Sequence, residues 1–242
     1  MKKRLDLLVQ ELHPEFSRTY IQSIIMQGKV LVDGQPVSKP GTAIATDIDI
    51  KVIAAEPKFV GRAGFKLEKA LDHFEIDVKD YVVLDSGIST GGFTDCMLQR
   101  GARRVYGVDV GYGQVHEKVA RDKRLTLMER TNLRYLEKLP ELVDLVTLDL
   151  SFISILKVMP AVSGLIKPEG KIITLIKPQF EAEKKDIGRG GVIKDETVRQ
   201  KVIEKIRVGM KEFGFRMVDL IDSPILGAKG NKEFLALFEW EN

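Results

Sequence analysis

Short, almost wholly apolar runs that alternate with amphipathic segments are the feature that most constrains the fold of this chain. Runs of this kind begin at Tyr81, Arg103, Leu142 and Lys171, whereas residues 195–215 have the spacing of an amphipathic helix. Strands that are apolar throughout are buried on both faces, which is typical of a parallel sheet covered by helices. We therefore expect an α/β domain with a mostly parallel sheet.

The first 55 residues have a different pattern. Two stretches have apolar residues at helical spacing, Gly28 stands where the second helix should end, and Asp33-Gly34 is typical of a tight turn between two strands. A chain of 242 residues has room for one full-sized core and a smaller unit. We expect a small α+β domain at 1–55, a linker at 56–60 and the α/β domain at 61–242.

Composition argues against several classes of protein. No stretch approaches the roughly 20 apolar residues of a membrane-spanning helix, and Asp6 interrupts the N-terminal apolar stretch, so we expect neither a membrane span nor a secretory signal. Cys96 is the only cysteine, which excludes an internal disulfide and a cysteine-based metal site and favours a reducing, cytoplasmic location without a metal. A net charge of +3 permits a nucleic-acid partner without requiring one.

A glycine-rich loop, "LDSGISTGGFTD" at 84–95, follows the first strand of the α/β domain. Ligands of open α/β sheets lie beyond the carboxyl ends of the strands, which is where this loop should be. Gly87, Gly91 and Gly92 let the backbone approach a ligand, and the helix starting near Phe93 offers free N–H groups. Taken alone, the loop slightly favours a simple tight turn.

Asp109 strengthens the case for a ligand. It ends the second strand, 24 residues after Asp85, where a carboxylate can accept hydrogen bonds from ribose hydroxyls. The pair favours a nucleoside pocket. An NAD-type dinucleotide is one candidate, but the glycines do not reproduce G-x-G-x-x-G. S-adenosylmethionine fits better, because it has one ribose, no phosphates and a charged tail that Asp85 and the loop amides can hold.

Four charged residues stand at predicted strand ends or beside the first strand: Lys66, Asp149, Lys177 and Glu233. If the strand that starts at Glu233 runs antiparallel, three of them meet at one edge of the sheet. A ribose 2'-hydroxyl is a weak acid and needs a base to react, a role that Lys177 can fill while the carboxylates fix the lysines. Singly, each is more often a solvent-facing charge or a surface ion pair.

The order of these motifs carries a family resemblance. "GRAGFKL", "LDSGISTGGFTD", "GVDVG", "LDLSF", "LIKPQFE" and "GNKEFLALFEW" resemble, in order, those of the FtsJ-like RNA 2'-O-methyltransferases, in the branch called TlyA or hemolysin A. The resemblance implies a Rossmann-like S-adenosylmethionine methyltransferase domain with an antiparallel last strand, and a catalytic tetrad at Lys66, Asp149, Lys177 and Glu233. The residues expected around the cofactor are Asp85, Gly87, Ser89, Thr90, Gly91, Gly92, Phe93, Asp109 and Asn132.

Residues 1–55 resemble the S4 RNA-binding domain through "RLD", "SRTYIQSIIMQGKVLVDG" and "KPG". The candidate RNA contacts are Arg4, Arg18, Lys29, Lys39 and, beyond this domain, Arg62. Residues 1–58 carry eight basic and seven acidic side chains, so we expect a docking aid of modest affinity. A basic helix either extends this surface or is a solvated face with internal ion pairs; its basic residues are Arg199, Lys201, Lys205 and Arg207.

Three functions remain open at this point. The resemblance implies an rRNA methyltransferase that modifies a ribose 2'-oxygen, of a cytidine, in ribosomal RNA or ribosomal subunits. A noncatalytic RNA-binding or ribosome-assembly factor that retains the pocket is the first alternative. A membrane-active hemolysin is the second, and the lack of a bilayer-spanning stretch argues against it.

Overall fold

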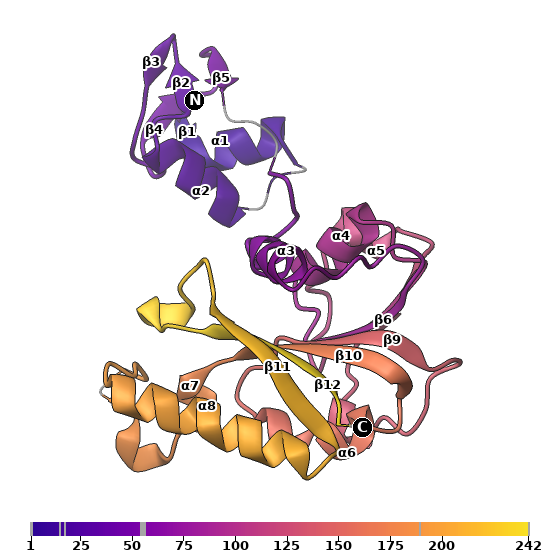
Figure 1. The fold of residues 1–242 in the computed structure, drawn as a ribbon. Coiled ribbons are helices and arrows are strands. Elements are labelled where there is room, and N and C mark those ends of the chain that lie inside the picture. The colour runs from indigo at the N-terminus through magenta and orange to yellow at the C-terminus, as the bar shows by residue number, and fades with distance from the viewer. Residues whose placement is uncertain (1, 15, 17, 54–56, 189, 242) are drawn as a thin grey trace. The chain divides into compact units, whose positions relative to one another are not determined.

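The computed structural model describes residues 2–14, 16, 18–53, 57–188 and 190–241. The chain forms two compact units, Met1–Lys58 and Phe59–Asn242, which are described separately below (Figure 1). This boundary falls inside the linker expected at 56–60, of which residue 56 lies outside the described residues.

The first unit is built from two helices and two small sheets. The helices are α1 (Leu5–Leu12) and α2 (Arg18–Met26). The strands are β1 (Lys2–Arg4), β2 (Val30–Val32), β3 (Gln35–Pro36), β4 (Ala43–Ala45) and β5 (Ile50–Val52), with β1 paired to β4 and a three-stranded order β3-β2-β5. Leu5, Val9, Ile21 and Ile25 are the fully buried apolar side chains of the helices, so both helices contribute their apolar faces to one core.

The second unit is centred on a seven-stranded sheet in the order β11-β12-β10-β9-β6-β7-β8. Its strands are β6 (Val82–Ser86), β7 (Arg104–Val108), β8 (Leu125–Met128), β9 (Val143–Leu148), β10 (Ile166–Ile176), β11 (Phe215–Asp222) and β12 (Phe234–Trp240). Only β12 pairs antiparallel with its neighbours, and the other pairs in this sheet are parallel. The predicted mostly parallel sheet with an antiparallel last strand is therefore confirmed.

Helices cover both faces of this sheet, as the apolar strands require. On one face lie α3 (Ala63–His73), α4 (Gly92–Gln99) and α5 (Glu117–Ala120), and on the other lie α6 (Met159–Val162) and α8 (Glu196–Lys211) (Figure 1). The remaining helical segments are α7 (Pro178–Glu181), η1 (Leu133–Tyr135), η2 (Ile155–Lys157), η3 (Lys184–Asp186) and η4 (Ala228–Gly230). In the described part of the chain, no helix has both the length and the apolar character needed to cross a bilayer.

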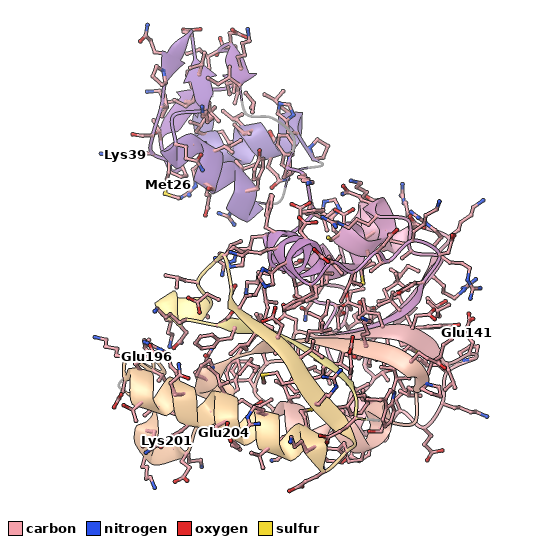
Figure 2. All side chains as sticks on the ribbon, in the orientation of Figure 1. Met26, Lys39, Glu141, Glu196, Lys201 and Glu204 are labelled. Atoms are coloured by element: carbon pink, nitrogen blue, oxygen red, sulfur yellow. The ribbon has the colours of Figure 1, made fainter. Side chains whose placement is uncertain are left out.

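The basic helix of the sequence is α8, and three of the four basic residues named from the sequence contact other groups of the unit. Arg199 and Arg207 pair with Glu196 and Glu204, one turn earlier. Lys205 Nζ donates a hydrogen bond to the carbonyl of Glu181 at 2.6 Å. Glu196, Lys201 and Glu204 extend from the side of α8 that faces away from the sheet (Figure 2). The structure therefore favours an ion-paired, solvated face for this helix.

The sheet order creates the place for a site. Strand β6 lies at the centre, β7 follows on one side, and β9 lies on the other. The loops after β6 and its two neighbours consequently diverge at the carboxyl end of β6, and open α/β sheets bind ligands at such a point.

Candidate active site

The strand register brings three of the four charged candidates to this same edge. Ile176, the last residue of β10, is paired with Phe234, the first residue of β12, so Lys177 and Glu233 stand next to each other beyond that pair. Asp149 directly follows β9, whose last residue, Leu148, is paired with Thr174 of β10. We predicted this convergence from the sequence for the case that the last strand is antiparallel. Strand β12 is indeed antiparallel to β10.

The four side chains form two ion pairs at different depths. Lys177 Nζ lies 2.6 Å from Asp149 Oδ1, with side chains that are 11% and 17% exposed. Lys66 Nζ, from α3, donates to Glu233 Oε2 at 2.6 Å, with side chains that are only 7% and 3% exposed. The first pair is thus the one that a substrate can reach, and the second lies beneath the surface.

Lys177 has a further neighbour that fixes its amine. Its Nζ donates a hydrogen bond to Ser151 Oγ at 3.1 Å, so a hydroxyl and a carboxylate both hold the lysine head group. An amine held in one place can accept a proton from a hydroxyl placed beside it, whereas a mobile surface lysine cannot do so reliably.

A cavity of about 440 Å³ opens beside this pair, within the size range of small-ligand sites. The loops after β6, β7, β8 and β9 line it. The lining residues are Gly87, Ser89, Val108, Asp109, Val110, Gln114, Thr131, Asn132, Leu133, Asp149, Leu150, Ser151, Phe152, Ile153 and Val158. Asp149 and Ser151 therefore belong both to the cavity wall and to the surroundings of Lys177.

Asp109 connects two of the loops that line the cavity. Its Oδ2 accepts a hydrogen bond from the backbone N–H of Ser89 at 2.8 Å, and its Oδ1 accepts one from Gly111 N at 2.7 Å. Asn132 Oδ1 accepts from Arg134 N at 3.1 Å, which fixes the Asn132 side chain at the start of η1. Gly87, Ser89, Asp109 and Asn132 are the expected cofactor residues that line the cavity.

The rest of the predicted glycine loop packs closely against neighbouring helices. A Cβ on Gly91 would lie 3.0 Å from Val119 Cγ1, and one on Gly92 would lie 3.0 Å from the backbone nitrogen of Gly64. Phe93 is buried in the core between α3, α4 and the sheet. Together with the exposed Thr90, these residues do not line the cavity. Gly91 and Gly92 let the start of α4 approach α5 and α3, and direct contact of this part of the loop with a cofactor stays a prediction.

Asp85 lies beneath the loop and is not among the residues that line the cavity. Its side chain is fully buried, and its two oxygens accept hydrogen bonds from Thr94 Oγ1 at 2.6 Å and Thr147 Oγ1 at 2.8 Å. It is therefore not presented to a ligand in the cavity. Burial raises the pKa of Asp85 to about 6; the two threonine hydrogen bonds oppose this, and the charge of Asp149 adds to it. Asp85 supports the loop from below.

The raised pKa predicts a pH dependence of stability. Because the folded pKa of Asp85 is about 6 and an unfolded aspartate titrates near ~3.9, the native state binds the proton more tightly, and this stabilisation is lost as pH rises through 6. Between pH 4.5 and 7.5 the unfolding free energy of the wild type should fall by about 2 kcal/mol more than that of Asp85→Asn. The single tryptophan, Trp240, lies in this unit, so its fluorescence in urea titrations measures the effect. Identical pH slopes for the two proteins would contradict the assignment.

Sequence reasoning missed the segment that follows Asp149. Phe152 has a φ of +64°, is 90% exposed and lies 4.9 Å, between ring centroids, from Phe180. Glu181 is buried, and its Oε1 accepts a hydrogen bond from Ile155 N at 2.7 Å. Glu181 thereby joins the helix after Lys177 to the cavity wall after Asp149. Glu181, the last residue of "LIKPQFE", was the sequence signal for this contact. A carboxylate so close to a buried strand needs a hydrogen-bond partner.

The RNA-binding candidates are divided between the units. Arg4, Arg18, Lys29 and Lys39 belong to the first unit and are exposed, and Arg62 is exposed at the start of α3 in the second. Lys39 extends outward from its unit (Figure 2). The structure thus leaves all five side chains accessible to a partner.

Comparison with known proteins agrees with this division. Residues 59–240 match the model of the FtsJ-like methyltransferase family, and residues 3–46 match the S4 domain. Hemolysin A of Brachyspira hyodysenteriae is 41% identical, covering 97% of this chain and 99% of its own length. The 16S/23S rRNA (cytidine-2'-O)-methyltransferase TlyA of Mycobacterium tuberculosis is also 41% identical, covering 90% of this chain and 82% of that protein.

Solved structures give the same picture of the fold. A solved structure from Streptococcus thermophilus, titled as a hemolysin, superposes on this chain with a TM-score of 0.79 and 37% sequence identity. The match covers 100% of this chain and 89% of that one. The similarity therefore extends over both units and is not limited to the sheet and its helices.

Proposed function

Since this chain belongs to the FtsJ-like methyltransferase family and begins with an S4 domain, we propose that it is an S-adenosylmethionine-dependent rRNA methyltransferase that modifies a ribose 2'-hydroxyl of a cytidine. One observation supports the proposal most strongly. Asp149 lines the ligand cavity and also forms an ion pair with Lys177. A methyl donor bound in the cavity would therefore lie next to the base that accepts the proton of the hydroxyl.

The cavity suits this cofactor in size and chemistry. Asp109, at the carboxyl end of β7, would hold the ribose hydroxyls, and Asn132 would contact the adenine edge. Val110, Leu133 and Ile153 supply apolar lining for a flat ring. S-adenosylmethionine, when bound, supplies a methyl group that its sulfonium already activates.

The chain's own residues then handle the proton. Lys177 Nζ, in its neutral amine form, accepts the proton of the 2'-hydroxyl and becomes an ammonium, and the oxygen attacks the methyl group as the proton leaves. Asp149 and Ser151 hold Nζ in place and stabilise the ammonium that forms. The buried Lys66–Glu233 pair fixes the start of β12 beside Lys177, so it acts as a support for the amine that reacts.

The first unit provides contacts to folded rRNA through its exposed basic side chains, and Arg62 adds one from the second unit. A target base inside a folded RNA is turned out of its stack to bring its ribose to Lys177. A ribosomal substrate places the reaction in the cytoplasm.

Transfer of labelled methyl groups to purified ribosomal subunits tests the proposal. We expect label in rRNA with wild-type enzyme and none after omission of subunits. A noncatalytic RNA-binding or assembly factor would bind subunits without labelling them, and a hemolysin would release dye from liposomes. Either of those results, with no label in rRNA, would overturn the proposed activity.

The cavity wall itself can be tested by Gly87→Ala. Gly87 has a φ of +85°, and a Cβ there would lie 2.6 Å from the carbonyl oxygen of Asp149. The variant must shift that backbone and should bind S-adenosylmethionine at least about tenfold more weakly in calorimetry, equal to about 1.4 kcal/mol. Gly113→Ala is the matched control, because Gly113 has a φ of +66° but open space around it. Equal losses in both variants would mean that backbone strain alone is responsible.

A further inference from the structure

Asp6 is an unusual residue for the interior of a small domain. Among the described residues of the first unit it is the one charged side chain that is buried, with no exposed surface. Burial of a carboxylate is costly unless charged or hydrogen-bonding partners compensate for the lost water. The contacts of Asp6 therefore show what the buried charge achieves.

Two arginines converge on this carboxylate. Arg4 donates from Nε to Oδ1 and from Nη2 to Oδ2, both at 2.9 Å, which is the two-pronged geometry of a strong arginine–carboxylate pair. Arg18 Nη2 lies 3.6 Å from Oδ2, and Gln22 Nε2 donates to the same oxygen at 3.1 Å. Arg4 and Arg18 come from β1 and α2, so Asp6 brings together two segments of the unit.

Both arginines keep N–H donors that do not contact Asp6. Their side chains remain 50% and 60% exposed, whereas Asp6 has no exposed surface. A guanidinium has five N–H donors; Arg4 uses donors on two nitrogens here, and Arg18 approaches with one nitrogen. The cluster of Asp6, Arg4 and Arg18 therefore has a net charge of +1 and retains donors that can reach solvent.

A third basic segment packs against the same cluster. The N–H of Asp6 donates to the carbonyl of Pro40 at 3.0 Å, and a Cβ on Gly41 would lie 3.5 Å from Arg4 Nη1. Lys39, one residue earlier, is exposed and extends outward (Figure 2). The backbone of this turn is thus fixed beside the Arg4 guanidinium.

We propose that Asp6 is a positioning residue that holds Arg4 and Arg18 as a preformed pair for one phosphate group of the RNA backbone, with Lys39 on the adjoining turn. The inference rests on the proposed function for its RNA partner. A phosphate accepts several N–H groups at once, and arginine is the residue best suited to provide them. Arginine side chains that are already held in place lose less entropy when they bind a phosphate. Asp6 therefore favours complex formation, although its own negative charge repels the phosphate.

Asp6→Asn gives a test in which simple electrostatics and positioning predict opposite signs. Removal of a negative charge beside a phosphate site should tighten RNA binding if only net charge matters. If Asp6 positions the arginines, the variant should bind purified ribosomal subunits about tenfold more weakly. The matched control is Asp47→Asn, which makes the same chemical change at an exposed position of the same unit. It should bind as tightly as the wild type or slightly more tightly.

Two further measurements keep the test decisive. Binding of S-adenosylmethionine to each full-length variant checks that the second unit is intact, and circular dichroism checks the fold. If Asp6→Asn does not fold, Arg4→Lys and Arg18→Lys replace it: each keeps the charge but loses the fork, and each should weaken subunit binding about tenfold. Wild-type affinity in Asp6→Asn, or in both lysine variants, overturns the inference. Failure of the proposed function would appear separately, as wild-type binding without 2'-O-methylation.

Discussion

Replacement of Lys177 by methionine is expected to lower methyl transfer to ribosomal subunits by about a thousandfold. A positioned general base typically contributes about 10²- to 10⁴-fold to a rate, and Lys177 Nζ is the amine held by Asp149 and Ser151 at the cavity. Methionine keeps the apolar stem but cannot accept a proton. Single-turnover transfer of labelled methyl groups measures the change, and equilibrium binding of cofactor and subunits should stay within about threefold of wild type.

Lys171→Met is the matched control for this variant. Lys171 lies at the middle of the same strand, β10, where its Nζ pairs with Glu239 at 2.7 Å. It should retain wild-type turnover. If Lys177→Met retains more than about a tenth of the wild-type rate, another group takes the proton and the assignment of the base is wrong.

Glu233→Ala is expected to destabilise the second unit by about 3–5 kcal/mol. The change leaves the Lys66 ammonium, 7% exposed, without the carboxylate that its Nζ contacts at 2.6 Å, and a buried charge without a partner is costly. Urea unfolding followed by Trp240 fluorescence measures this. Glu117→Ala removes the carboxylate of an exposed pair with Arg121 and should cost under about 1 kcal/mol.

The double variant Lys66→Met with Glu233→Gln separates stability from catalysis. Uncharged side chains of similar length remove both buried charges, so the unfolding free energy should return to within about 1 kcal/mol of wild type. Methyl transfer should be slower than in the wild type, because the charged pair beside Lys177 is gone. Full recovery of activity along with stability would show that the pair serves the fold alone.

The overall architecture was predictable because buried strands appear in the sequence as short runs of apolar residues. Strands apolar on both faces, such as residues 143–148, have few alternatives to a covered parallel sheet. The meeting of Asp149, Lys177 and Glu233 also follows from sequence, since each flanks a strand end and only the direction of β12 had to be assumed.

The internal geometry of the loops was not predictable in the same way. Asp85 and Gly87 are two residues apart, yet one is sealed between Thr94 and Thr147 while the other lines the cavity. The positive φ of Phe152 leaves no pattern in the sequence either. Asp6 interrupts an apolar stretch, and nothing near it in the sequence indicates its partners. They are distributed over three separate segments, and only the folded chain brings them together.

The central claim is that Lys177 and the cavity beside Asp149 deliver a methyl group to a ribose oxygen. The most direct measurement is mass spectrometry of nucleosides from ribosomal subunits incubated with wild-type enzyme and isotope-labelled S-adenosylmethionine. The account predicts labelled 2'-O-methylcytidine, which disappears with Lys177→Met. Label on a base, or labelled 2'-O-methylcytidine at wild-type levels in that variant, would contradict it.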